Sequence, residues 1–220
     1  MIGSRGGIGG AVVRRLVQIG YQPLLEMDLD GPIGIDLSNP ASVERAFAKG
    51  RSQVARLDAL VVASGILDLH KLNDLSLERW NDILAVNLTG PFLCCQLARD
   101  WLNDGGRIVL IGSLAGRTGG VLTGTAYAVS KGGIESLTKS VAQELAPRRI
   151  TVNCVAPGGV DTPMLASNPP EGLAAMKAAT PLKRMAAPEE IAAAIAFLLS
   201  DDAAFITGSV MAVNGGLRMD

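Results

Sequence analysis

The chain has 220 residues, and its 20 Lys and Arg nearly balance its 21 Asp and Glu, which gives a formal net charge of −1. This balance lacks the basic surplus typical of nucleic-acid-binding proteins, so we predict no nucleic-acid partner. The apolar runs are shorter than the roughly 20 residues that cross a bilayer, and we predict no membrane partner either. The length fits one domain, residues 1–220, with a sizeable core.

The predicted elements alternate between strand-like and helix-like segments. We expect helices over residues 9–19, 38–50, 80–101 (interrupted at Gly90–Pro91), 127–146 and from 188 onward. We expect strands over residues 23–28, within 29–36, and over 57–65, 107–112, 150–156 and 210–213. This order favours an α/β fold, a doubly wound, mostly parallel Rossmann-type sheet with helices on both faces. Residues 160–187 have no firm period, and we expect an irregular segment there that covers the substrate as a lid.

The cysteines and the histidine indicate whether the protein binds a metal and in which compartment it lies. The three cysteines, Cys94, Cys95 and Cys154, have neither the spacing of a disulfide framework nor that of metal ligands. His70 is the only histidine, and one histidine cannot build a metal site. No signal peptide precedes the first motif, which begins at residue 3. We therefore predict no metal, free thiols and a cytoplasmic protein.

A glycine-rich loop, Gly3-Ser-Arg-Gly-Gly-Ile-Gly9, stands directly before the first expected helix. Glycines permit positive φ and a close approach of the backbone to a ligand, and the helix N-terminus offers free N–H groups to a pyrophosphate. The loop therefore predicts a dinucleotide site. An ordinary turn before a helix is the alternative.

The type of dinucleotide is decided about 20 residues beyond such a loop. Glu26, Asp28 and Asp30 stand there, and no Lys or Arg occurs between residues 20 and 36. A carboxylate accepts hydrogen bonds from ribose hydroxyls and repels a 2′-phosphate. We predict NAD rather than NADP, with Asp28 as the first choice for the contact and Glu26 as the second. Arg5 could bind a phosphate, which is the argument for NADP.

Three residues carry a candidate catalytic function. Tyr127 and Lys131 are four residues apart in an expected helix, so that phenol and ammonium share one face. A nearby cation favours phenolate and lowers the pKa of the tyrosine, which suits it to proton transfer. Ser113 follows the apolar strand at 107–112, where open α/β sheets bind ligands. Taken singly, these residues could be a core tyrosine, a solvated lysine and a helix-capping serine.

Together these motifs resemble those of the short-chain dehydrogenase/reductase family, from Gly3 to about Leu217. The resemblance implies an NAD(P)-dependent oxidoreductase that interconverts an alcohol and a carbonyl. The matching segments, in the family's order, are Gly3–Gly9, Asn87-Leu-Thr-Gly, Ile111-Gly-Ser113, Tyr127-x-x-x-Lys131, Pro157-Gly158 with Thr162, and residues 206–216.

The resemblance also implies a role for each residue. Tyr127 is the general acid/base, Lys131 also binds the nicotinamide ribose, and Ser113 polarises the carbonyl. In the family, a residue matching Asn87 holds a water that relays protons, and one matching Thr162 bonds the carboxamide. The implied cofactor contacts are Gly3, Ser4, Arg5, Gly7, Ile8, Gly9, Asp28, Asp36, Leu37, Ala63, Ser64, Gly65, Asn87, Tyr127, Lys131, Pro157, Gly158, Val160 and Thr162. One departure is Val62-Ala-Ser-Gly65, where the family usually has Asn-Asn-Ala-Gly.

A second departure is that only Met1 and Ile2 precede the glycine loop, where family members have a central strand. We therefore expect a barely occupied central sheet position beside residues 24–28 and 57–62, and limited stability. The reading frame would begin upstream, the strand would be lost from the sequence, or another segment or subunit would fill the gap.

Substrate, assembly and two alternative functions complete the predictions. Apolar residues in the lid suggest a moderately hydrophobic small-molecule alcohol or ketone: Met164, Leu165, Leu173, Met176 and Leu182. The resemblance implies a homo-oligomer, tetramer or dimer, built through helices near 80–103 and 127–146. The alternatives are a catalytically silent dinucleotide-binding or scaffold protein, and an inactive N-terminally truncated fragment.

Overall fold

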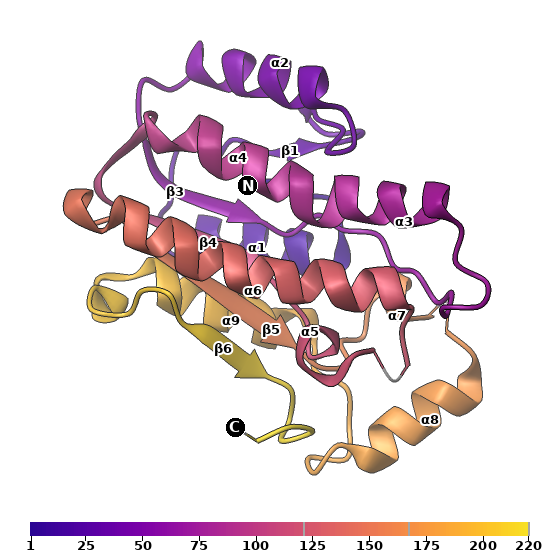
Figure 1. The fold of residues 1–220 in the computed structure, drawn as a ribbon. Coiled ribbons are helices and arrows are strands. Elements are labelled where there is room, and N and C mark those ends of the chain that lie inside the picture. Colours follow the sequence, from indigo (N-terminus) through magenta and orange to yellow (C-terminus); the bar gives the residue numbers. More distant parts are fainter. Residues whose placement is uncertain (121, 167, 220) are drawn as a thin grey trace.

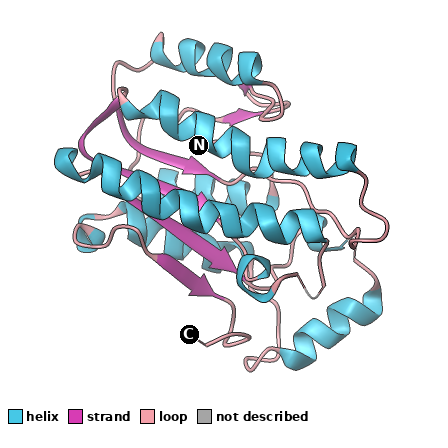
Figure 2. Ribbon diagram, in the orientation of Figure 1, coloured by secondary structure: helices cyan, strands magenta, loops and turns pink. Residues whose placement is uncertain are grey.

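A computed structural model describes residues 1–120, 122–166 and 168–219. A parallel sheet lies between two layers of helices, as Figure 1 and Figure 2 show. Its strands are β1 (Met27–Asp28), β2 (Ile33–Gly34), β3 (Leu57–Val62), β4 (Leu102–Ile111), β5 (Thr151–Pro157) and β6 (Val210–Val213). The longer helices are α1 (Gly7–Gln18), α2 (Pro40–Arg51), α3 (Leu77–Leu84), α4 (Gly90–Arg99), α6 (Thr125–Leu145), α8 (Pro170–Ala179) and α9 (Pro188–Leu199). The shorter ones are the π-helix η1 (Ala85–Thr89), α5 (Ala115–Thr118), η2 (Ala146–Arg148), α7 (Pro163–Ala166) and η3 (Asp201–Ala203).

The strands form two parallel groups, β1–β2 and β3–β4–β5–β6. Side chains from α2, α4 and α6 fill a core on one face of the sheet, and those from α1 and α9 fill a second core on the other. Both faces are thus covered, which is why β5 is buried along its whole length. The α/β doubly wound fold predicted from the alternating pattern is confirmed.

The two strand groups are joined by Ile2. It forms single parallel bridges to Met27 on one side and to Val62 on the other, and its side chain is 0 % exposed. The ladder extends only to its neighbours, since Met1 N–H donates to Leu25 O at 2.8 Å and Gly3 N–H to Met27 O at 2.8 Å. A cavity of about 310 Å³ lies beside Met1 and Ile2. The barely occupied central position expected beside residues 24–28 and 57–62 is confirmed.

Several predicted bounds change in the structure. The strand expected over 23–28 is assigned only at Met27–Asp28, because the central position beside it is occupied by a single bridging residue, Ile2. The helix expected from residue 80 begins at Leu77, since the Ser76 hydroxyl accepts Arg79 N–H at 3.1 Å and caps it. The chain stays helical past Gly90–Pro91, through η1 into α4.

The expected irregular segment at 160–187 is wrong in one respect, because it contains the helices α7 and α8. Proline stands at the first position of both, where a missing N–H has no cost. None of the described helices is long and apolar enough to cross a membrane.

Ile2→Ala should lower the free energy of unfolding by about 2–5 kcal/mol, because it empties a fully buried site that links the two halves of the sheet. Urea denaturation followed by circular dichroism measures the change. Leu29→Ala is the control: Leu29 is 68 % exposed and should change stability by no more than about 0.5 kcal/mol. If both variants lose the same small free energy of unfolding, Ile2 does not stabilise the centre of the sheet.

Candidate active site

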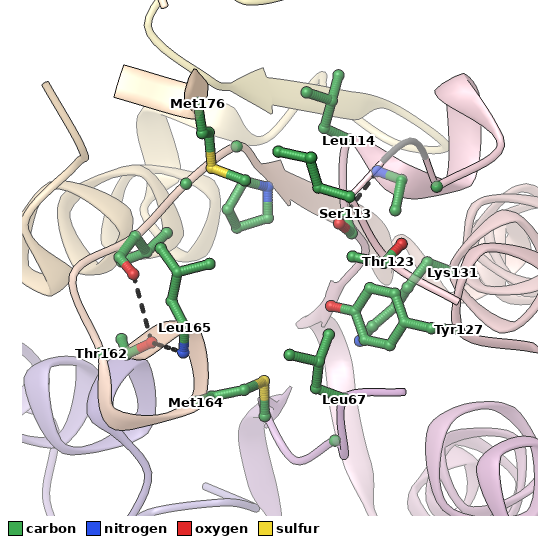
Figure 3. A pocket seen from close by; sticks show the side chains of 18 of the residues that line it. Leu67, Ser113, Leu114, Thr123, Tyr127, Lys131, Thr162, Met164, Leu165 and Met176 are labelled. Carbon is green, nitrogen blue, oxygen red and sulfur yellow. Dashed lines mark hydrogen bonds between the residues drawn. The ribbon is translucent and has the colours of Figure 1, made fainter. Parts of the chain in front are cut away.

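The candidate site lies at the carboxyl ends of β3, β4 and β5. Gly65 follows β3, Ser113 follows β4, and Pro157 ends β5, while Tyr127 and Lys131 come from the first two turns of α6. All five line one cavity of about 500 Å³, whose close view is Figure 3. Parallel strands end together at one edge of a sheet, which is the usual ligand position in this architecture.

Tyr127 and Ser113 stand together at one wall of this pocket (Figure 3). Burial raises the pKa of Tyr127 above its usual value, and a side-chain hydrogen bond with Ser113 lowers it in part. Ser113 Oγ also accepts the backbone N–H of Ala115 at 3.1 Å, which orients the hydroxyl. The pair is therefore arranged to hold one substrate oxygen between two hydroxyls.

Lys131 is buried behind the tyrosine. Its ammonium donates to Ile111 O at 2.9 Å and lies 5.7 Å from the centroid of the Tyr127 ring. Burial lowers the pKa of Lys131 to about 8. We expected Lys131 to lower the pKa of Tyr127, but in the structure desolvation dominates and raises it. The reason is that the ammonium points to a backbone carbonyl at the end of β4.

Asn87 lies in the π-helical turn η1 and is 1 % exposed. Its Oδ1 accepts Ile66 N–H at 2.8 Å, and its Nδ2 donates to Ile66 O at 2.9 Å. A Cβ on Gly65 would meet Asn87 Oδ1 at 3.2 Å and Lys131 Nζ at 3.5 Å. Asn87 thus fixes the end of β3 beside the ammonium, and π-turns of this kind are frequent at functional sites.

The glycine loop folds tightly enough to fit a dinucleotide. Gly3 has φ +81°, and a Cβ on Gly9 would stand 1.7 Å from Gly3 O, so neither position tolerates a side chain. The 12-residue α1 starts after Gly6, and the free N–H groups of its first turn face the loop. The buried hydroxyl of Ser4 has no hydrogen-bond partner among the described residues, which marks it as a donor for a bound group.

The predicted ribose carboxylate reaches this loop. Asp28 ends β1, and its Oδ2 accepts Arg5 N–H at 2.8 Å while its Oδ1 accepts Leu29 N–H at 2.8 Å. The two residues predicted for the adenine are placed less directly. Asp36 Oδ1 is engaged by Ser38 Oγ at 2.7 Å, and buried Leu37 packs where a Cβ on Gly90 would stand.

Thr162 connects the loop to the pocket. Its Cγ2 would be 2.7 Å from a Cβ on Gly7, and its hydroxyl accepts Leu165 N–H at 3.4 Å (Figure 3). The predicted cofactor residues that also line the cavity are Ile8, Ala63, Ser64, Gly65, Tyr127, Lys131, Pro157, Gly158, Val160 and Thr162. The other nine belong to the glycine loop, the β1 and β2 ends, or Asn87.

Several lining residues were missed by the sequence reasoning. They lie in loops after strand ends, at the end of α5, or at residues 122–123: Leu67, Leu114, Thr118, Leu122 and Thr123. Proximity to Gly65 and Ser113 could have indicated the first two. Of the five apolar lid residues predicted, Met164, Leu165 and Met176 line the pocket, whereas Leu173 and Leu182 do not.

Comparison with known proteins agrees with this geometry. The model of the family described as enoyl-(acyl carrier protein) reductase matches residues 4–218. A crystal structure from Brucella melitensis, titled short-chain dehydrogenase/reductase, superposes with a TM-score of 0.92 at 33 % identity, over 100 % of this chain and 95 % of that one. The chain belongs to the short-chain dehydrogenase/reductase family. It is therefore an oxidoreductase that uses a nicotinamide cofactor.

Other members of the short-chain dehydrogenase/reductase family show how varied its substrates are. 3-Oxoacyl-(acyl-carrier-protein) reductase FabG of Escherichia coli is 40 % identical over 84 % of this chain and 76 % of its own length. Cis-4-hydroxycyclohexanecarboxylate dehydrogenase of Sinomonas cyclohexanicum is 33 % identical over 97 % of this chain and 93 % of its own length. A metagenomic blue fluorescent protein in complex with NADPH has a TM-score of 0.91 at 29 % identity, over 99 % and 96 % of the two chains.

The rate of carbonyl reduction should fall as pH rises through about 8. Lys131 is charged below its pKa of about 8, and Tyr127, whose pKa is raised, remains a proton donor there. The measurement is kcat/KM for the carbonyl substrate between pH 6 and 10. In Lys131→Arg, the guanidinium stays charged, so the fall should move to higher pH. An unchanged midpoint in that variant would assign the fall to another group.

Proposed function

We propose that this protein interconverts a neutral, apolar ketone and its secondary alcohol with NAD(H), using Tyr127 as general acid/base. The observation that carries the proposal is the pocket of Figure 3. Ser113, Tyr127 and Lys131 form one side of it, while Leu67, Met164, Leu165 and Met176 supply apolar walls. Binding sites of this size are commonly apolar with a few converging polar groups.

Each polar residue has a part in the reduction. When bound, the nicotinamide supplies the hydride to the carbonyl carbon. Tyr127 gives its phenolic proton to the carbonyl oxygen, and Ser113 donates a hydrogen bond to the same oxygen. The buried ammonium of Lys131 stabilises the phenolate that remains, because the charges interact in a site shielded from water. In alcohol oxidation the same residues act in reverse.

The absence of a second cation in the wall favours a neutral substrate. Of the described residues that line the pocket, only Lys131 is charged. A carboxylate or phosphate on the substrate would require a further Arg or Lys to offset its desolvation. Two relatives are named for substrates of their own: one for a 3-oxoacyl-(acyl-carrier-protein) and the other for a cis-4-hydroxycyclohexanecarboxylate. Here we propose an uncharged apolar body of moderate size.

NAD is the proposed cofactor because Asp28 faces the glycine loop. Its carboxylate accepts Arg5 N–H at 2.8 Å, and this negative charge at the glycine loop supports NAD because it would repel a 2′-phosphate bound there. NADP is the second candidate, for two reasons. The side chain of Arg5 is exposed beside this carboxylate, and a structural neighbour is named as a complex with NADPH.

We also propose that the protein is a homo-oligomer, that residues 160–187 form a substrate lid, and that the protein is cytoplasmic. A homo-oligomer through α4 and α6 is supported by exposed apolar side chains on these helices, with Phe92 44 % and Val129 46 % exposed. Residues 160–187 supply Val160, Thr162, Met164 and Met176 to the pocket, which suits a lid. The three cysteines are buried and free, which suits the reducing cytoplasm.

Tyr127→Phe should lower kcat by about a hundred- to ten-thousand-fold, because only the transferable proton is lost. NADH affinity, measured by fluorescence titration, should stay within about two-fold. Tyr21→Phe is the matched control: Tyr21 donates to Leu199 O at 2.9 Å, away from the pocket, and the variant should keep full kcat. Full activity in Tyr127→Phe would end the assignment of the general acid/base.

NADH should bind more tightly than NADPH, and Asp28→Ala should narrow the difference by removing the charge that repels the 2′-phosphate. Titration of both cofactors against both proteins measures it. Asp30→Ala, an exposed acid two residues away, should leave the difference unchanged. Tighter NADPH binding by the parent protein would reverse the cofactor assignment and transfer it to Arg5.

A further inference from the structure

A buried carboxylate outside the catalytic group lies in the loop between β3 and α3. Asp68 has a side chain only 1 % exposed, yet it forms a charged cluster. Its Oδ1 accepts Arg79 Nε at 2.9 Å and the His70 ring at 2.8 Å, and its Oδ2 accepts His70 N–H at 3.1 Å. Burial by itself raises the pKa of Asp68, but the hydrogen bonds from His70 and Arg79 outweigh it and the net pKa is lowered.

The backbone of this loop caps α6, the helix that carries Tyr127. Asp68 O accepts Gly124 N–H at 2.6 Å, and His70 O accepts Thr125 N–H at 3.0 Å. These are two of the N–H groups that a helix leaves without a partner at its start. Gly124 has no side chain with which to cap its own helix, so the cap comes from a segment more than 50 residues earlier in the chain.

The contact is close enough to fix the position of the helix start. A Cβ on Gly124 would lie 2.5 Å from Asp68 Oδ2 and 2.7 Å from His70 O. A carboxylate next to a helix N-terminus also interacts favourably with the helix dipole. Tyr127 stands only three residues beyond Gly124, so a displacement of this cap moves the phenol.

The same cluster also places a wall of the pocket. Leu67 precedes Asp68, lines the cavity and packs against Tyr127 (Figure 3). Arg79 holds it there, since its Nη2 donates to Leu67 O at 3.2 Å while its Nε donates to Asp68. Lys71 on this segment donates to the carbonyl oxygen of another lining residue, Gly120, at 2.7 Å.

We propose that Asp68 is a positioning residue, which, clamped by Arg79 and His70, sets the distance between Tyr127 and the substrate oxygen by fixing the start of α6 and the Leu67 wall. This inference rests on the proposed function of Tyr127. The cofactor loop at residues 3–9 and Asp28 are not part of the cluster. Because these residues are among the predicted cofactor contacts, NADH affinity should depend on the cluster far less than kcat does.

The test uses Arg79→Ala and Asp68→Asn in the full chain. Both should lower kcat by about ten- to a hundred-fold, as a misplacement of up to about 1 Å does, with NADH affinity within about two-fold of the parent. Arg79 is 36 % exposed, so guanidinium at millimolar concentration should reach the vacated site and restore kcat in Arg79→Ala. It should not restore Asp68→Asn, and sodium at equal ionic strength should restore neither. Asp74→Asn, an exposed acid of the same loop, is the control and should match the parent.

The outcomes separate the two proposals. No turnover of any ketone by the parent protein would end the proposed function and leave this inference without a basis. Normal turnover by the parent together with parental kcat in Arg79→Ala would overturn the positioning role alone. A loss that guanidinium fails to restore, or equal losses of kcat and NADH affinity, would assign the cluster to general stability and also overturn it. If Asp68→Asn does not fold, Arg79→Ala and its rescue decide.

Discussion

The parallel register of β3, β4 and β5 is the constraint on which the site depends. Val62, Leu110 and Cys154 stand at one level of the sheet, and Ile111 pairs with Val155. The three strands β3, β4 and β5 therefore end at the same edge of the sheet. Gly112 N–H donating to Val155 O and Leu114 N–H donating to Pro157 O carry the alignment beyond the last strand residues. Ser113 lies between these two bonds, so its hydroxyl is fixed by backbone and not by side-chain packing alone.

The helix α6, which carries the proposed general acid/base, is held against these strands from two directions. Inside, Lys131 bonds Ile111 O at the end of β4. At its start, the carbonyls of Asp68 and His70 accept the first amides of α6. With one end of the Tyr127–Lys131 segment anchored to the end of β4 and the other to the loop after β3, the phenol has little freedom relative to Ser113. Preorganisation of this kind is what proton transfer to a developing alkoxide requires.

The same sheet is weakest at its centre. One buried isoleucine bridges the two strand groups, whereas β3 and β4 share five register pairs. The N-terminal ammonium itself takes a ladder position and is buried, and burial lowers its pKa to about 6. The candidate site lies on the far side of β3 from this gap.

The sequence by itself determined the family and the α/β order, and it predicted Ser113, Tyr127 and Lys131 as the candidate catalytic residues, because each depends on local spacing. Helical periodicity put Tyr127 and Lys131 on one face, and apolar runs marked β3, β4 and β5. Only the tertiary structure decided the pKa shifts of the site residues and the pocket walls that come from distant segments of the chain. Desolvation, which raises the pKa of Tyr127 and lowers that of Lys131, is a property of everything packed around a group. Likewise the contacts of Asp68 with α6 join segments more than 50 residues apart, and no local pattern encodes such a pairing.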